Sequence, residues 1–204
     1  MKIGILGGSF DPIHNGHMHM AESALSAFAL DQVWLVPAGH SPNKEEAGMT
    51  AADDRFRMCE IAAASCDRLY ASRIEIDAPE RSYTYRTLEK LNESMPEHEF
   101  FFIMGGDSLD YFEQWKRPER ICELAAVLVI PRDAFDTEAL AEKIRRISGL
   151  FRCDIRIVPC SRFPLSSTQI RKSLQNGSLR DSDFPPGVAE YIKAKHLYES
   201  PRKF

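Results

Sequence analysis

Short apolar runs alternate with segments of helical periodicity along the chain, and this alternation constrains the fold more than any other feature. The apolar runs cover 3–6, 33–36, 69–76, 100–104, 125–130 and 155–158, and they predict strands. Segments of helical spacing cover 18–28, 50–64, 84–91, 118–124, 138–147, 168–175 and 187–194. Strands separated by helices favour a parallel sheet with right-handed crossovers. We therefore predict an α/β fold, a Rossmann-like doubly wound parallel sheet with helices on both faces and a small helical C-terminal segment over 165–200.

Composition and charge narrow the class of protein. The 204 residues are 44% hydrophobic and 27% charged, which is ordinary for one globular domain spanning 1–204. A formal charge of −4 gives no overall field that would attract nucleic acid or an anionic membrane. The N-terminal run breaks into glycines too early for a signal peptide, and no apolar run approaches the ~20 residues of a membrane helix. We expect a cytoplasmic protein that binds neither nucleic acid nor membrane.

The cysteine pattern also favours a cytoplasmic protein. They number five, an odd count, and no C-x-x-C pair occurs among them. This pattern favours reduced thiols over a disulfide framework or a zinc site. The residues concerned are Cys59, Cys66, Cys122, Cys153 and Cys160.

Residues 7–17 form the most unusual stretch, Gly-Gly-Ser-Phe-Asp-Pro-Ile-His-Asn-Gly-His. It lies between a predicted strand and a predicted helix, where α/β proteins hold phosphate against backbone N–H groups. It lacks the G-x-G-x-x-G spacing of a dinucleotide fingerprint, and the chain has no Gly-Lys pair for a P-loop. Either His14 or His17 alone would fit a solvated turn. The glycines, Phe10, Pro12 and both histidines together predict a histidine-lined phosphate turn, which resembles the G-x-F-x-P-x-H-x-G-H signature of the nucleotidyltransferase superfamily.

Three other predicted strands also end in chemically unusual segments. Residues 37–44 form a proline-bounded loop holding Lys44, and residues 105–108 read Gly-Gly-Asp-Ser. In the third segment, 164–171, Ser166 and Gln169 have capping-box spacing, and Arg171 follows one turn into the helix. A capped helix start with an arginine suits a polyphosphate, although a well-capped surface helix would look the same.

The segment 164–171 is similar to the I-S-S-T-x-x-R motif that accompanies the H-x-G-H turn in adenylyltransferases. Three further stretches restrict the resemblance to one group of adenylyltransferases. They are Ser82-Tyr83-Thr84, the Gly-Gly-Asp-Ser segment with Trp115 after it, and residues 185–192. Over residues 1–198 the chain resembles the bacterial nicotinate-nucleotide adenylyltransferases.

This resemblance implies a reaction in NAD biosynthesis. The phosphate of nicotinate mononucleotide attacks the α-phosphorus of ATP directly, giving deamido-NAD and pyrophosphate without a covalent intermediate. A phosphate with a second pKa of ~6 is largely dianionic at neutral pH and needs no general base. The implied catalytic residues His14, His17 and Arg171 therefore donate hydrogen bonds and position the phosphates.

The resemblance also implies the substrate contacts. Asp107 lies near the adenosine ribose, Trp115 stacks on the pyridine ring, and backbone N–H groups of Thr84 and Lys116 hold the pyridine carboxylate. Our own hypothesis is that the Lys116 side chain adds selectivity for the acid over the amide. Mg²⁺ is carried by the ATP phosphates, and we expect no protein-bound metal. The implied ATP-binding residues are Gly8, Ser9, Phe10, His14, His17, Lys44, Gly105, Asp107, Ser167, Thr168 and Arg171.

Alternatives stay open at this point. A sibling adenylyl- or cytidylyltransferase acting on phosphopantetheine or nicotinamide mononucleotide shares the first motif, and a nucleotide-sensing module would keep the fold without turnover. A metal protein using His14, His17 and His19 lacks further ligands, and a tRNA synthetase needs a longer chain. Asn43 and Arg86 depart from the family pattern. The sequence is compatible with a homo-oligomer and does not fix the oligomeric state.

Overall fold

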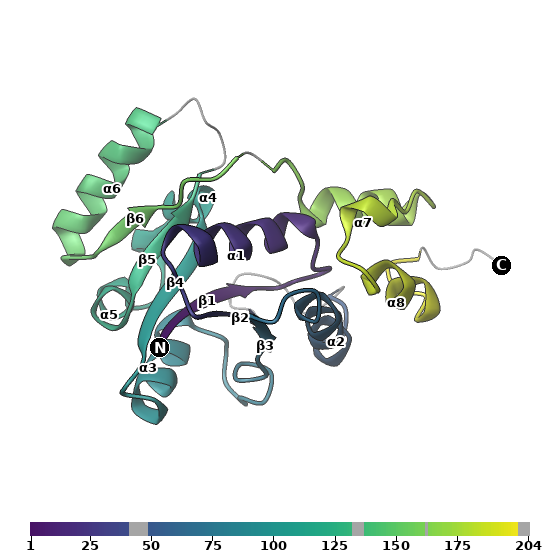
Figure 1. The fold of residues 1–204 in the computed structure, drawn as a ribbon, viewed down its shortest axis with the longest axis horizontal. Helices are drawn as coiled ribbons and strands as arrows, with labels where there is room; N and C mark the ends of the chain where they lie inside the picture. The colour runs from purple at the N-terminus through teal and green to yellow at the C-terminus, as the bar shows by residue number, and fades with distance from the viewer. Residues whose placement is uncertain (41–48, 132–136, 162, 200–204) are drawn as a thin grey trace.

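The computed structural model describes residues 1–40, 49–131, 137–161 and 163–199. Within these ranges six parallel strands form one sheet in the order β3-β2-β1-β4-β5-β6 (Figure 1). The chain adds β2 and β3 on one side of β1 and then crosses over to lay β4, β5 and β6 on the other. The predicted doubly wound parallel sheet is confirmed, with its switch point between β1 and β4. The strands are β1 (Lys2–Gly8), β2 (Gln32–Pro37), β3 (Leu69–Ala71), β4 (Glu99–Gly105), β5 (Ala126–Ile130) and β6 (Ile155–Ile157).

Helices cover both faces of this sheet. One apolar core lies between the sheet and α1, α2, α7 and α8, and a second lies between the sheet and α3, α5 and α6. Alternation along β4 separates the two, because Phe101 and Ile103 belong to the first core while Phe100, Phe102 and Met104 belong to the second. The helices are α1 (Asn15–Ala27), α2 (Ala52–Ala63), α3 (Thr84–Ser94), α4 (Gly106–Leu109), α5 (Pro118–Leu124), α6 (Thr137–Phe151), α7 (Ser167–Gln175) and α8 (Val188–Ala194), with 3-10 turns η1 (Phe112–Gln114) and η2 (Asp181–Asp183).

The predicted strand over 69–76 is too long. β3 ends at Ala71, and the chain then turns, with the Asp77 N–H donating to the Arg73 carbonyl at 2.9 Å. The strand pairs with β2 over only three residues and lies at the edge of the sheet. Because β3 has only one neighbouring strand, few hydrogen bonds hold it in the extended conformation. The alternating residues after Ala71 therefore do not continue the strand.

The C-terminal helical segment returns to the carboxyl end of β1. Figure 1 shows α7 and α8 together at that end of the molecule, close to the start of α1. The Asn15 side chain donates to the Ser182 carbonyl at 2.8 Å, and the Tyr191 hydroxyl donates to Asp54 on α2 at 2.7 Å. The C-terminal helical segment is therefore in direct contact with α1 and α2.

The expectation of reduced thiols is wrong for one pair of cysteines. Cys122 on α5 and Cys153, which follows α6, form a disulfide with their Cα atoms 4.7 Å apart. The pair is 31 residues apart in sequence and is brought together by the packing of α5 against α6, which no cysteine spacing could reveal. One premise of the cytoplasmic expectation, reduced thiols throughout, therefore does not hold. Among the described residues, no helix has the length and apolar character needed to cross a membrane.

Candidate active site

The turn after β1 is closed by two histidines that cap one another. His14 is the N-cap of α1, and its Nδ1 accepts from the Gly16 N–H at 3.1 Å. In return the backbone N–H of His14 donates to Nδ1 of His17 at 3.2 Å. The two imidazoles stack with centroids 3.8 Å apart. This is a capping box built from imidazoles in place of the usual hydroxyl and carboxamide groups.

The capping box determines which ring nitrogen carries the proton. A backbone N–H can only donate, so Nδ1 of each ring must be the unprotonated acceptor. In a neutral imidazole the proton then sits on Nε2, which makes Nε2–H the donor of each ring. Burial lowers the pKa of His14 to about 4, because only 3% of its surface is exposed and desolvation penalises the charged form. His14 is therefore neutral at pH ~7.

Both histidines line a cleft of about 350 Å³ at the carboxyl ends of the strands. The opposite walls come from segments at least 85 residues away in sequence. The cleft is lined on the first side by His14, Gly16, His17, His19 and Met20, and on the others by Gly105, Gly106, Asp107, Ile130, Pro131, Ser161, Phe163, Pro164, Leu165, Ser166, Ser167 and Gln169. This is the position that the switch-point rule gives for ligands of a doubly wound sheet.

The start of α7 is joined to the histidine turn by hydrogen bonds. Ser166 caps α7 by accepting from the Gln169 N–H at 3.3 Å, as the sequence predicts. The Ser167 hydroxyl donates to the Pro12 carbonyl at 3.1 Å, and Arg171 donates to the Asp11 carbonyl at 2.6 Å. The guanidinium also lies 3.4 Å from the Thr168 hydroxyl. Histidines and arginine are thus on one side of the molecule, although Arg171 is not among the cleft-lining residues.

The other predicted ATP contacts fall into three groups: residues that precede the histidine turn and do not line the cleft, residues that line it, and one residue outside the described part of the chain. Gly8 ends β1, Ser9 follows it, and the Phe10 ring is buried against His17 with centroids 4.9 Å apart. Gly105 and Asp107 line the cleft at the end of β4 and the start of α4. Lys44 and its neighbour Asn43 lie outside the described residues.

The predicted mononucleotide contacts form a second group. Thr84 is the first residue of α3. The side chain of the N-cap residue, Tyr83, accepts no hydrogen bond from the backbone N–H groups at the start of this helix. Trp115 follows η1 and packs beside Phe102, and the centroids of the two rings are 5.9 Å apart. Its buried Nε1–H has no hydrogen-bond partner in the described part of the chain. Tyr83 and Trp115 belong to the same apolar cluster, and Lys116 next to it is exposed.

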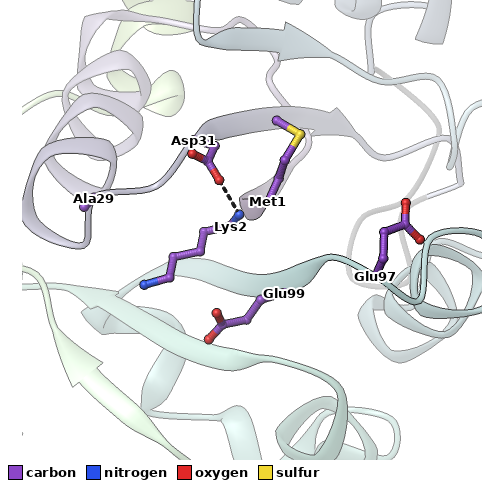
Figure 2. A pocket seen from close by; sticks show the side chains of 6 residues that line it. All are labelled: Met1, Lys2, Ala29, Asp31, Glu97 and Glu99. Carbon is purple, nitrogen blue, oxygen red and sulfur yellow. Dashed lines mark hydrogen bonds between the residues drawn. The ribbon is translucent and has the colours of Figure 1, made fainter.

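Another hollow, at the opposite end of the strands, is a poor site for a nucleotide. Figure 2 shows it, about 450 Å³ in volume, lined by residues of the amino ends of the strands and the loops before them. The backbone N–H of Lys2 donates to Asp31 there at 2.6 Å. The carboxylates of Asp31, Glu97 and Glu99 outnumber the one ammonium group of Lys2 in the lining, so the hollow would repel a triphosphate. The histidine cleft is the better candidate.

Sequence reasoning missed the residues that support the turn from behind. Arg55 is not among the site residues that the sequence predicts, yet it is 2% exposed and donates to the Ser9 carbonyl at 2.7 Å. A signal was present, because Arg55 lies one helical turn before the buried Met58 and Cys59, on the apolar face of α2.

The geometry agrees with comparisons to known proteins. The family profile described as cytidylyltransferase-like matches residues 5–173. A curated relative from Geobacillus thermodenitrificans is 36% identical over 97% of this chain and 86% of its own length, and one from a Synechococcus strain is 37% identical over 98% and 96%. Both are named "Probable nicotinate-nucleotide adenylyltransferase".

Solved structures share the fold. The nicotinic acid mononucleotide adenylyltransferase of Plasmodium falciparum, complexed with NaAD, matches with a TM-score of 0.77 at 23% identity and covers 97% of both chains. A structure from Vibrio parahaemolyticus matches with a TM-score of 0.68 at 22% identity, covering 94% of this chain and 98% of its own. The family profile and the full-length relatives together lead to one conclusion: the chain belongs to the nicotinate-nucleotide adenylyltransferases, within the cytidylyltransferase-like family.

Proposed function

We propose that the protein transfers the adenylyl group of ATP to nicotinate mononucleotide, giving deamido-NAD and pyrophosphate in NAD biosynthesis. A phosphate oxygen of the mononucleotide attacks the α-phosphorus in line and forms the new P–O bond. The bond from the α-phosphorus to the bridging oxygen breaks, and pyrophosphate leaves with the electron pair. The attacking phosphate is already anionic, so the protein's task is to position the two substrates and stabilise developing charge.

The observation that carries this proposal is the reciprocal histidine cap. Because both Nδ1 atoms accept from backbone N–H groups, each ring has Nε2–H as its donor. His17 donates to the α-phosphate and His14 to the outer phosphates as charge shifts toward the leaving pyrophosphate. The stacking and the cap hold both rings in place before ATP binds, so little reorganisation is needed during the reaction.

The remaining ATP contacts surround this pair. Backbone N–H groups of Gly8, Ser9 and Phe10 cradle the phosphates next to the start of α1, whose dipole also favours an anion. Ser167, Thr168, Arg171 and Lys44 bind the β- and γ-phosphates, and Asp107 with Gly105 receives the ribose. Mg²⁺ enters with ATP and neutralises phosphate charge. Among the described residues, no group of three or more His, Cys, Asp or Glu side chains could hold a metal ion.

The mononucleotide binds beside Trp115. The start of α3 at Thr84 offers backbone N–H groups that no cap side chain satisfies, which suits the pyridine carboxylate. Trp115 offers its face to the pyridine. Lys116 adds a positive charge next to it and favours the acid over the amide.

A substrate panel tests the function. The protein is mixed with ATP, Mg²⁺ and one of nicotinate mononucleotide, nicotinamide mononucleotide or phosphopantetheine, and pyrophosphate release is measured together with product mass. We expect release with nicotinate mononucleotide at a rate at least ~10-fold above the amide, with deamido-NAD as product. Faster release with phosphopantetheine, or with CTP in place of ATP, would favour a sibling transferase. Nucleotide binding without release would indicate a sensing module.

A further inference from the structure

A buried arginine supports the phosphate turn from the side of α2. Nη1 of Arg55 donates to the Ser9 carbonyl at 2.7 Å, and its Nε donates to the Thr50 carbonyl at 3.0 Å. The side chain is 2% exposed, and burying a guanidinium is unfavourable unless it is paired. The buried Asp11 carboxylate supplies the opposite charge: burial lowers the pKa of Arg55, and Asp11 raises it.

The C-terminal tail completes this buried cluster. The Tyr198 hydroxyl donates to Oδ1 of Asp11 at 2.7 Å, across 187 residues of sequence. Burial and the Asp11 charge raise the pKa of Tyr198, so the phenol stays protonated and remains a donor. Arg171 donates to the backbone carbonyl of the same aspartate. Residues from α2, α7 and the tail thus converge on the back of the turn.

Fixing the Ser9 carbonyl also fixes the next N–H group. In a trans peptide the carbonyl of one residue and the N–H of the next point in opposite directions. With the Ser9 carbonyl held by Arg55, the Phe10 N–H points away from the buried cluster. Phe10 has a φ of 45°, in the left-handed region that residues other than glycine seldom adopt. Such a conformation persists where surrounding contacts determine it, and successive N–H groups around it form an anion-binding concavity.

We propose that Arg55 is a positioning residue for adenylyl transfer: it holds the Ser9–Phe10 peptide so that the Phe10 N–H faces the triphosphate, while Asp11 and Tyr198 keep the guanidinium in place. The inference rests on the proposed role of this turn as the phosphate site. A merely structural role would lower stability and leave the handling of ATP unchanged in the folded protein.

Two tyrosines of the C-terminal segment provide a matched pair of variants. Tyr198→Phe removes the hydroxyl that holds Asp11, and Tyr191→Phe removes a hydroxyl that donates to Asp54 at the same distance of 2.7 Å. Both variants delete one hydrogen bond between this segment and a carboxylate, but only Tyr198 touches the cluster. Arg55→Lys keeps the charge and loses the two-pronged contact.

The experiment measures kcat, the KM of each substrate, and the calorimetric affinity for inorganic tripolyphosphate, all at a temperature where each variant is folded. We expect Tyr198→Phe to lower kcat/KM for ATP and tripolyphosphate affinity by about 5-fold each, as for one weakened hydrogen bond. Arg55→Lys should lower them by ~10-fold or more, with the KM of nicotinate mononucleotide unchanged in both. Tyr191→Phe should match the unmodified protein.

The outcomes separate this inference from the proposed function. Equal ATP parameters in Tyr198→Phe and Tyr191→Phe would overturn the positioning role, whether or not Arg55→Lys folds. So would tripolyphosphate that fails to bind the unmodified protein at millimolar concentration. If the unmodified protein binds tripolyphosphate but never turns over nicotinate mononucleotide, the proposed function fails, and the affinity difference between the two tyrosine variants still decides the positioning role.

Discussion

Protonation of His14 should make the protein less stable in acid, and the size of the effect follows from its burial. The pKa is about 4 in the folded protein against 6.5 for an ordinary histidine. Between these values the unfolded chain binds more protons than the folded one, so stability is lost as pH falls from 6.5 toward 4. A difference of 2.5 pKa units corresponds to about 3 kcal/mol of unfolding free energy.

The variant His14→Asn isolates this contribution. Asparagine is a favoured N-cap residue, so its side-chain oxygen can still accept from the Gly16 N–H while the titrating ring is gone. We expect the unmodified protein to lose about 3 kcal/mol more unfolding free energy than His14→Asn between pH ~7.5 and pH ~4. Carboxylates that also titrate in this range contribute equally to both proteins and cancel in the difference.

Urea titrations followed by far-UV circular dichroism at a series of pH values give both stability curves. The same variant should lose at least ~10²-fold in kcat at neutral pH, because the Nε2–H donor is missing. Parallel stability curves, with the two proteins losing the same free energy on acidification, would refute the buried neutral imidazole and with it the tautomer assignment.

Three further predictions concern other parts of the molecule. Lys116→Ala should lower the ratio of kcat/KM for nicotinate mononucleotide to kcat/KM for nicotinamide mononucleotide by ~3-fold or more. An unchanged ratio would show that the Lys116 side chain does not contribute to selectivity. Burial raises the pKa of Glu75 above 4.5, so its ionisation lowers the stability of the folded protein as pH rises beyond that value. Glu75→Gln keeps an oxygen that can accept from the Thr87 hydroxyl, which lies at 2.6 Å, so its stability relative to the unmodified protein should increase with pH. A stability difference that stays constant with pH would contradict this. Gly39→Ala would place a Cβ 2.3 Å from the Glu75 carbonyl oxygen, so it should cost about 1–3 kcal/mol in urea unfolding, whereas unaltered stability would mean that this backbone contact is looser than the structure has it.

The order and type of the elements could be predicted because each strand and helix has its own apolar periodicity. The run over 100–104 and the helix over 118–124 correspond closely to β4 and α5. Patterning says less about where an edge strand stops, so β3 ended earlier than expected. It also says nothing of contacts made only in three dimensions, such as the disulfide between Cys122 and Cys153.

The site was predictable where chemistry was concentrated in one turn. His14, His17 and the cap at Ser166 could be found because their spacing relative to a helix start is local. The reciprocal imidazole cap could not, because histidine is not among the usual N-cap residues. The cluster of Asp11, Arg55 and Tyr198 depends on packing between distant segments, which a local pattern does not encode.

The most direct measurement is the steady-state rate of pyrophosphate release by His17→Ala at saturating ATP and nicotinate mononucleotide. His17 lines the cleft and would donate to the α-phosphate, and removal of one preorganised donor should lower kcat by at least ~10²-fold. The circular dichroism spectrum should stay that of the unmodified protein, because the ring contributes only half of the cap. A folded His17→Ala variant with near-normal kcat would contradict the account, since the reaction would then proceed without the imidazole on which it depends.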